Sequence, residues 1–119
     1  MPPWRKLVLT WDELHAIPSS WKAKLSEWRG IDYIHDTADG KGYVGAAYGQ
    51  SNIDGRWKSH RAPGQGDSKL LRARNPSGLQ FSILQRTSPD MGTGDIQDLE
   101  ASWKVRLHTH ESEGGLNAN

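Results

Sequence analysis

The 119-residue sequence contains no cysteine and no long run of apolar residues. Without cysteine, the chain can form neither a disulfide framework nor a metal site built from thiolates. Its apolar runs are far shorter than the roughly 18 residues of a membrane-spanning helix. The start of the chain, MPPWRKLVLTW, also lacks the apolar segment of a secretory signal. These absences predict a cytoplasmic protein with no membrane partner.

The residues that are present support one small hydrophobic core. Hydrophobic residues make up 34% of the chain, which suits a single domain of this length. Six tryptophans help, because each brings a large apolar side chain to the interior.

The charge of the chain is unevenly placed. The net charge is only +1, but from Arg56 to Arg86 seven basic residues accompany a single acidic residue, Asp67, which gives this segment a charge of +6. A local positive field of this kind suits a polyanion such as nucleic acid. A basic face that contacts only solvent is the alternative.

The first 29 residues predict a tryptophan-rich layer of helices. KLVLT is typical of a short strand, and TWDE is a capping box in which Thr10 and Glu13 begin a helix that Pro18 ends. In the following segment, SSWKAKLSEW, the apolar residues recur at helical spacing and form one stripe. We therefore expect residues 1–29 to form an N-terminal helical extension that packs on a core formed by residues 30–119.

Residues 30–119 predict an α+β domain. GIDYIHD and GYVGAAY are typical of strands joined by a turn at Asp39-Gly40, and LQFSILQ alternates like a strand with one buried face. Three further segments predict helices: SNIDGRWKSH, DSKLLRARNP and DIQDLEASWKVRLHT. This order of elements indicates a small, mainly antiparallel three-stranded sheet flanked by helices.

A carboxylate in the last predicted helix needs a partner. Glu100 lies on the same side of this helix as its apolar stripe. Burying an unpaired carboxylate is costly, so an arginine or a metal ion is expected next to it. A structural salt bridge, or a side chain that reaches out from the edge of the stripe, is the alternative.

Two further pairs of residues suggest phosphate chemistry. Arg56 and His60 are four residues apart on a predicted helix and share a face. A guanidinium matches phosphate oxygens, and an imidazole can donate a hydrogen bond or relay a proton. Lys41 precedes Tyr43, and a nearby cation makes a phenol a better base. Each pair also occurs in proteins for purely structural reasons.

Five short segments of the chain match one family when they are taken in order. They are GIDYI, KGYVG, GRWKSH, LEASW and GLNAN, and they extend from Gly30 to Asn117. With the β-β-α-α-β-α layout, they resemble the GIY-YIG nuclease family. The resemblance implies a GIY-YIG-like sheet and a metal-dependent DNA endonuclease, or the nuclease domain of a larger DNA-processing protein. Its cofactor is then Mg²⁺ or Mn²⁺, its partner is DNA, and its reaction is phosphodiester hydrolysis.

The resemblance also implies roles for individual residues. Tyr43 matches the tyrosine of the second motif, and Arg56 and His60 match the pair that faces the phosphate. Glu100 matches the single carboxylate that holds the metal ion. Asn117 matches the late asparagine that braces the site. Lys41 resembles a lysine that some members place near the catalytic tyrosine.

The first motif departs from the family's pattern. Where the family reads Gly-Ile-Tyr, this chain reads Gly30, Ile31 and Asp32, and Tyr33 points to the opposite face of the predicted strand. Asp32 can serve as the base, bind the metal ion beside Glu100, or mark an impaired site. The last possibility leaves a second function open, a catalytically impaired nucleic-acid-binding module with a degenerate GIY-YIG site.

The length of the chain, its HTHE segment and its basic residues predict partners and a second possible metal site. Because 119 residues leave little room for target specificity, we expect cleavage with low specificity, a homodimer, or an additional specificity domain in a longer protein. A separate group in the segment HTHE, formed by His108, His110 and Glu111, can bind zinc or belong to a solvated tail. The residues expected to contact DNA are Lys58, Arg61, Lys69, Arg72 and Arg74.

Overall fold

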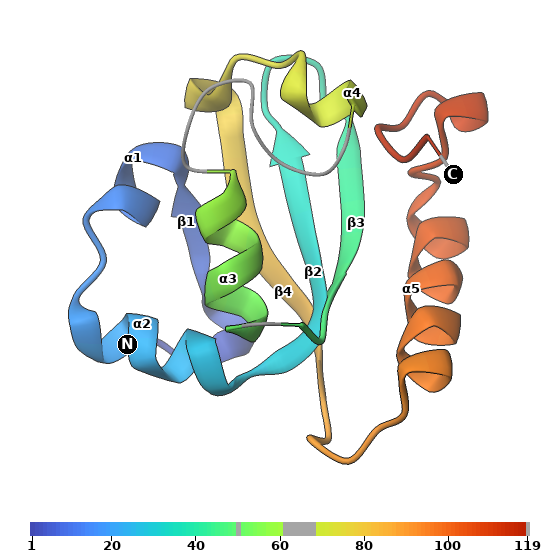
Figure 1. Cartoon of the computed structure of the whole chain (residues 1–119). Helices are drawn as coiled ribbons and strands as arrows, with labels where there is room; N and C mark the ends of the chain where they lie inside the picture. Colours follow the sequence, from blue (N-terminus) through green and yellow to red (C-terminus); the bar gives the residue numbers. More distant parts are fainter. Residues whose placement is uncertain (50, 61–68, 119) are drawn as a thin grey trace.

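The computed structural model describes residues 1–49, 51–60 and 69–118. The chain is an α+β fold with a four-stranded antiparallel sheet in the order β1-β4-β2-β3 and helices on both faces (Figure 1). The central strands β2 (Arg29–Asp36) and β4 (Leu79–Thr87) lie between β1 (Val8–Thr10) and β3 (Gly42–Ala47).

The prediction of a three-stranded sheet was wrong by one strand. The N-terminal strand β1 pairs with β4, with Val8 opposite Ser82 and Thr10 opposite Gln80. Its side chains alternate, since Leu7 and Leu9 are buried whereas Val8 is 53% exposed. The local pattern of KLVLT predicts a strand but does not show which sheet edge it joins, because that choice depends on pairing with residues about 70 positions away.

Two helices follow β1 and cover one face of the sheet. The predicted capping box is confirmed: the Thr10 hydroxyl accepts from the backbone N–H of Glu13 at 3.2 Å, and the Glu13 carboxylate accepts from the backbone N–H of Thr10 at 3.0 Å. This box begins α1 (Trp11–His15), and α2 (Ser19–Glu27) starts directly after Pro18.

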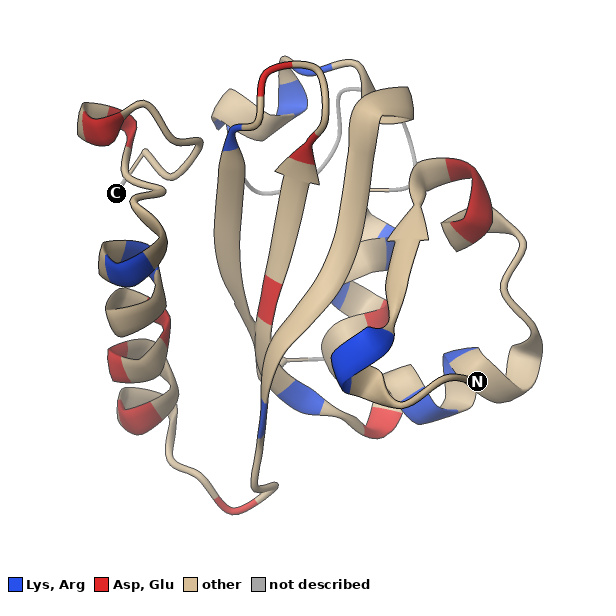
Figure 2. Ribbon diagram, turned by 180° about the vertical axis from the view of Figure 1, so that it is seen from behind, with Lys and Arg blue, Asp and Glu red and all other residues tan. Residues whose placement is uncertain are grey.

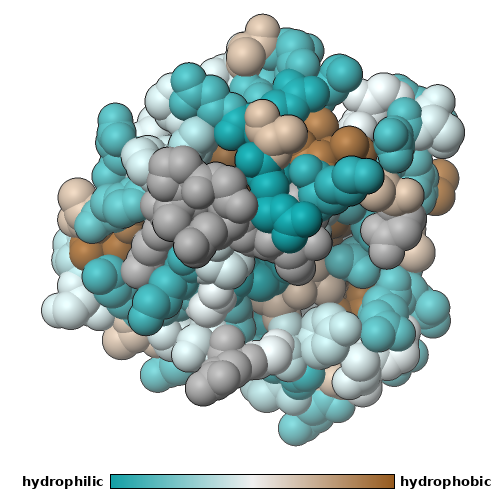
Figure 3. Space-filling view, turned by 45° about the horizontal axis from the view of Figure 1, so that its top comes forward, coloured by the Kyte–Doolittle hydropathy of each residue, from teal (hydrophilic) through white to brown (hydrophobic). Residues whose placement is uncertain are grey.

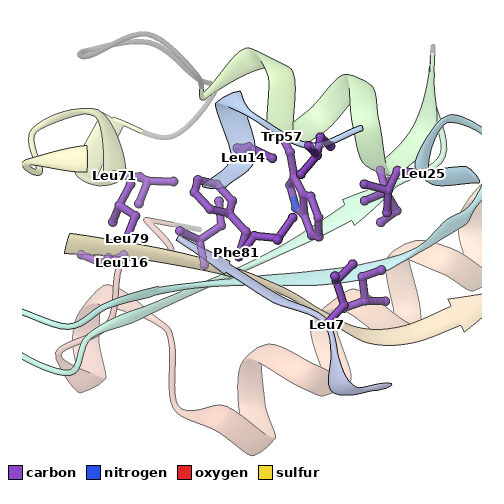
Figure 4. Close-up of a cluster of buried hydrophobic side chains, with 14 residues drawn as sticks. Leu7, Leu14, Leu25, Trp57, Leu71, Leu79, Phe81 and Leu116 are labelled. Carbon is purple, nitrogen blue, oxygen red and sulfur yellow. The ribbon is translucent and has the colours of Figure 1, made fainter. Parts of the chain in front are cut away.

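The main core lies between these helices, α3 (Asn52–Ser59) and the sheet. Trp57 from α3 contacts Phe81 from β4 edge to face, with ring centroids 5.9 Å apart. Residues 1–29 contribute to the same cluster through Leu7, Leu14 and Leu25 (Figure 4). The N-terminal segment therefore adds a strand to the sheet and packs its side chains into the same core as the rest of the chain.

The opposite face of the sheet is covered by α5 (Thr93–Leu107), which lies beside β3 (Figure 1). Ile96 from this helix packs on Ile31 and Val44 of the hairpin. The hairpin turns at Gly40, whose φ of 76° is readily adopted by glycine. This outcome confirms the predicted turn at Asp39-Gly40.

The remaining elements are short. They are the helix α4 (Lys69–Arg72) and the 3₁₀ turns η1 (Trp4–Lys6), η2 (Pro76–Gly78) and η3 (Glu111–Glu113). The predicted strand 79–85 and the three predicted helices of the core occur in the chain order that was expected. Within the ranges described above, no helix is long and apolar enough to cross a membrane.

One irregularity in the sheet lies next to the first motif. Ile31 pairs with Gln85 whereas Asp32 pairs with Ile83, so Leu84 is an extra residue in β4. Bulges of this kind bend a strand, change the direction of its side chains, and are common near functional sites. The bulge lies opposite Asp32, whose side chain faces α3 through the normal alternation of β2.

Candidate active site at the edge of the sheet

A pocket of about 390 Å³ opens at the outer edge of β3, between α3 and α5. It brings together side chains from four separate parts of the chain, including four of the residues that the resemblance matched. The lining residues are Tyr43, Ala46, Tyr48, Gly49, Arg56, Glu100, Lys104 and Asn117.

The side chain of Arg56 is bound by the carboxylate of Asp32. Its Nε donates to Asp32 Oδ1 at 2.8 Å, and the side chain of Arg56 is 14% exposed while that of Asp32 is fully buried. The other carboxylate oxygen of Asp32 accepts from the indole N–H of Trp57 at 3.2 Å. Because Arg56 and Trp57 are neighbours on α3, one carboxylate on β2 binds two consecutive side chains of this helix.

Gly45 provides the space that Arg56 occupies. Gly45 is the cross-strand partner of Asp32, and a Cβ atom at this position would lie 2.0 Å from Arg56 Nη2. The guanidinium carbon also lies 5.7 Å from the centroid of the Tyr43 ring. Asp32, Gly45 and Tyr43 therefore surround Arg56 on the sheet side.

Asp32 does not line the pocket. It is fully buried, and both of its oxygens accept hydrogen bonds from side chains of α3. This geometry does not favour its use as a second metal ligand beside Glu100. Tyr33, the next residue, lies on the other face of the sheet, where it stacks on His35 at 6.0 Å and partial burial raises the pKa of its phenol.

Glu100 and Lys104 form the α5 side of the pocket. They are one helical turn apart, with Lys104 Nζ at 3.9 Å from Glu100 Oε1, and both side chains are largely buried. The sequence predicted a charged partner for Glu100, and Lys104 of the same helix is one such partner. Lys104 was not among the predicted site residues. The signal was present in the sequence, because residues at i and i+4 on a helix are neighbours.

Asn117 closes part of the free edge of β3. Its side-chain amide donates to the Val44 carbonyl and accepts from the Val44 N–H, both at 2.9 Å. The backbone N–H of Leu116 donates to the Gly42 carbonyl at 2.9 Å. Asn117 therefore pairs with the edge strand as another strand does, which protects an exposed sheet edge and fixes the C-terminal segment beside the pocket.

Besides Asp32, two of the predicted catalytic residues, His60 and Lys41, are not among those lining the pocket. His60 caps the C-terminal end of α3, is only 3% exposed, and accepts a hydrogen bond from the Trp11 indole through its carbonyl at 3.1 Å. Lys41 is exposed in the hairpin turn, where its backbone N–H donates to Asp39 at 3.2 Å. Neither position could be derived from sequence spacing alone, because the distance of each residue from the pocket is set by tertiary packing.

The basic residues predicted to contact DNA have different surroundings. Lys58, Lys69 and Arg72 are exposed on α3 and α4, which carry blue segments in Figure 2. Arg74 is instead paired with the buried Asp36, at 3.3 Å, and with Asp39. Arg61 lies outside the described residues.

Removing Arg74 is expected to raise the pKa of Asp39. The hydrogen bond from Arg74 holds the pKa of the Asp39 carboxyl below its usual value, so this interaction stabilises the fold above the unfolded pKa, and its contribution disappears as the pH falls through the folded one. Arg74→Ala should return the Asp39 pKa, followed by NMR titration, toward its ordinary value. Arg72→Ala is the matched control on α4, and an Asp39 pKa unchanged in Arg74→Ala would contradict the prediction.

The alternative zinc site is not assembled. Among residues 1–49, 51–60 and 69–118, no three His, Cys, Asp or Glu side chains are grouped so as to hold a metal ion. His108 instead has its Nδ1 3.3 Å from Glu113 Oε1. His108 and His110 therefore belong to the turn that follows α5 rather than to a metal site.

Comparison with protein-family models, curated proteins and solved structures gives no match to this chain. The pocket and the residues that line it are therefore the basis on which a function can be proposed.

Proposed function

We propose that this protein is a divalent-metal-dependent DNA endonuclease with a GIY-YIG-like domain, and that the pocket beside β3 is its active site. The observation that carries the proposal is that Tyr43, Arg56, Glu100 and Asn117 line a single pocket. The resemblance to the GIY-YIG family assigns these residues to one site from four short sequence motifs. They come from β3, α3, α5 and the C-terminal segment, so their convergence is not a consequence of closeness in sequence.

In this proposal, Arg56 binds the scissile phosphate. A guanidinium matches two phosphate oxygens and stabilises negative charge that develops on them during hydrolysis. Tyr43 lines the same pocket and its ring lies beside Arg56, which makes its phenol the candidate group for taking a proton from the attacking water. Asn117 keeps β3, and with it Tyr43, in position.

Glu100 is the candidate metal ligand. Magnesium in phosphoryl-transfer sites is bound by one or two carboxylates, with waters and substrate phosphate oxygens completing its shell. Glu100 faces an open pocket large enough for a hydrated ion and a phosphate, so its position fits this use. A bound Mg²⁺ would supply a positive charge that stabilises the leaving oxygen.

A second candidate function is a nucleic-acid-binding module with an impaired site. Two observations favour it: Asp32 occupies the position of the family's first tyrosine and is committed to Arg56 and Trp57, and Lys104 already pairs with Glu100. Such a module would bind DNA through the same basic residues without hydrolysing it.

A plasmid-nicking assay separates the two candidates. The endonuclease should convert supercoiled plasmid to the open-circular form in Mg²⁺ or Mn²⁺ and should stop when EDTA is added. DNA binding without nicking, in either metal, would favour the impaired module. Absence of both binding and nicking would remove both proposals.

DNA binding by either candidate is expected to weaken steeply with salt. The end of the molecule that carries the hairpin turn and α4 is mostly hydrophilic, with only small separate hydrophobic patches, in the view of Figure 3. The double substitution Lys58→Ala, Lys69→Ala should weaken binding. It should also reduce the slope of log K against log salt by up to about 0.9 for each DNA phosphate that is no longer neutralised.

The matched control for this measurement is Lys6→Ala, Lys24→Ala, which removes two exposed lysines from the N-terminal segment. Fluorescence anisotropy at several salt concentrations gives both slopes. If the control lowers the slope as much as the double substitution on α3 and α4, the DNA lies against another part of the protein.

A further inference from the structure

Asp32 has a specific place beneath the proposed active site. It lies fully buried on β2, directly across the hairpin from Gly45, and its Oδ1 accepts from Arg56 Nε at 2.8 Å. We propose that Asp32 is a positioning residue that orients the Arg56 guanidinium for a phosphodiester in the pocket. This inference rests on the proposed function of the pocket, and it assigns Asp32 a role other than base or metal ligand.

The burial of the pair argues that its geometry is well defined. A buried carboxylate is tolerated only when its charge is compensated and its oxygens accept hydrogen bonds. Asp32 meets both conditions through Arg56 and Trp57. Because these two donors belong to neighbouring residues of α3, a rotation of the helix or of the carboxylate would break at least one of the bonds.

The contacts of Arg56 fix the orientation of its guanidinium. Guanidinium has five N–H donors in one plane, and Asp32 binds the donor on Nε. A hydrogen bond through Nε fixes this plane, with Nη2 lying over Gly45 and the Tyr43 ring beside it. A charged group that is oriented before the substrate arrives needs no reorganisation in the transition state.

This role predicts where the effect of losing Asp32 appears. A misplaced group that acts in the transition state lowers kcat, with a smaller effect on KM. If Asp32 works only through Arg56, the effects of removing the two residues should not add. If Asp32 were the base, its loss would add to the loss of Arg56 and would change the pH dependence of kcat.

The test is a double-mutant cycle on nicking kinetics in Mg²⁺. Asp32→Asn should lower kcat by about 10²-fold and leave KM within about threefold, and Arg56→Ala should lower kcat at least as much. The double variant should be no slower than Arg56→Ala alone. A double variant slower by the product of both effects, or loss of the acidic limb of the pH profile in Asp32→Asn, would overturn the proposal.

Asp36→Asn is the matched control. Asp36 lies on the same strand, is only 2% exposed, and also pairs with an arginine, Arg74. Its substitution removes a buried carboxylate of the same kind away from the pocket, so it should lower stability but leave kcat within a few fold. A loss of kcat equal to that of Asp32→Asn would show that Asp32 acts only through stability and would overturn the positioning role.

A second measurement does not depend on activity. The Arg56 Nε–H group should give a distinct NMR signal in the wild type, because its bond to Asp32 slows exchange with water, and inorganic phosphate should shift this signal. Both properties should be lost in Asp32→Ala, which leaves no acceptor for the Nε–H group. If the wild type does not nick DNA, the proposed function fails while this result still supports the positioning role; an Arg56 signal unchanged in Asp32→Ala overturns it.

Discussion

Glu100→Gln is expected to abolish nicking while DNA affinity stays within a few fold of wild type. The substitution keeps the size of the side chain but removes the carboxylate that, in the proposal, holds a divalent ion on the α5 side of the pocket. Without that ion, the leaving oxygen would lose its stabilising charge. DNA binding should persist, or even strengthen, because a negative charge near the phosphate has been removed.

The control for Glu100→Gln is Asp98→Asn, which removes an exposed carboxylate from the same helix. Its nicking rate should stay within a few fold of wild type. Isothermal titration with Mn²⁺ gives a readout besides activity, since metal binding should be lost in Glu100→Gln and kept in Asp98→Asn. Nicking at the wild-type rate by purified Glu100→Gln would remove the assignment of Glu100.

Gly45→Ala is expected to have the second large effect. The added Cβ atom would lie 2.0 Å from Arg56 Nη2, which is the end of a flexible side chain rather than backbone. The arginine, rather than the sheet, should therefore move, and its hydrogen bond to Asp32 should break. The expected result is a fall in kcat of about 10²-fold, since catalysis of this kind depends on position to within about 1 Å.

The fold should survive this substitution. Loss of one charge-assisted hydrogen bond predicts a decrease of about 1–3 kcal/mol in the free energy of unfolding, measurable by urea denaturation. Gly94→Ala in α5 is the control, because a Cβ atom there would meet nothing within 4 Å. A Gly45→Ala protein that nicks at the wild-type rate would show that the space under Arg56 has no role in the reaction.

Several elements of the fold could be predicted because their signals are local. The capping box at Thr10 and Glu13, the hairpin turn at Gly40 and the alternation of β4 each depend on residues within a few positions of one another. The predicted number of strands was wrong because the pairing of β1 with β4 joins residues far apart in the chain. Local patterns carry no information about that edge.

For the candidate site too, the sequence predicted some residues correctly as neighbours and misplaced or missed others. Sequence motifs selected Tyr43, Arg56, Glu100 and Asn117, and these residues line one pocket, although their catalytic roles stay predictions. The same reasoning also selected His60 and Lys41, which are not among the lining residues, and it missed Lys104. The periodicity of a helix or strand shows which residues share a face, but it does not show how far each residue lies from a pocket formed by several elements.

The amino-acid sequence by itself determined the α+β class, the order of the core elements and the concentration of basic residues between Arg56 and Arg86. The tertiary structure alone decided the place of Asp32. A carboxylate on β2 can face a metal ion, a substrate or an arginine, and spacing along the strand does not distinguish these surroundings. The packing of α3 on the sheet and the absence of a side chain at Gly45 bring Arg56 to Asp32, because a buried charge is stable only where a partner reaches it.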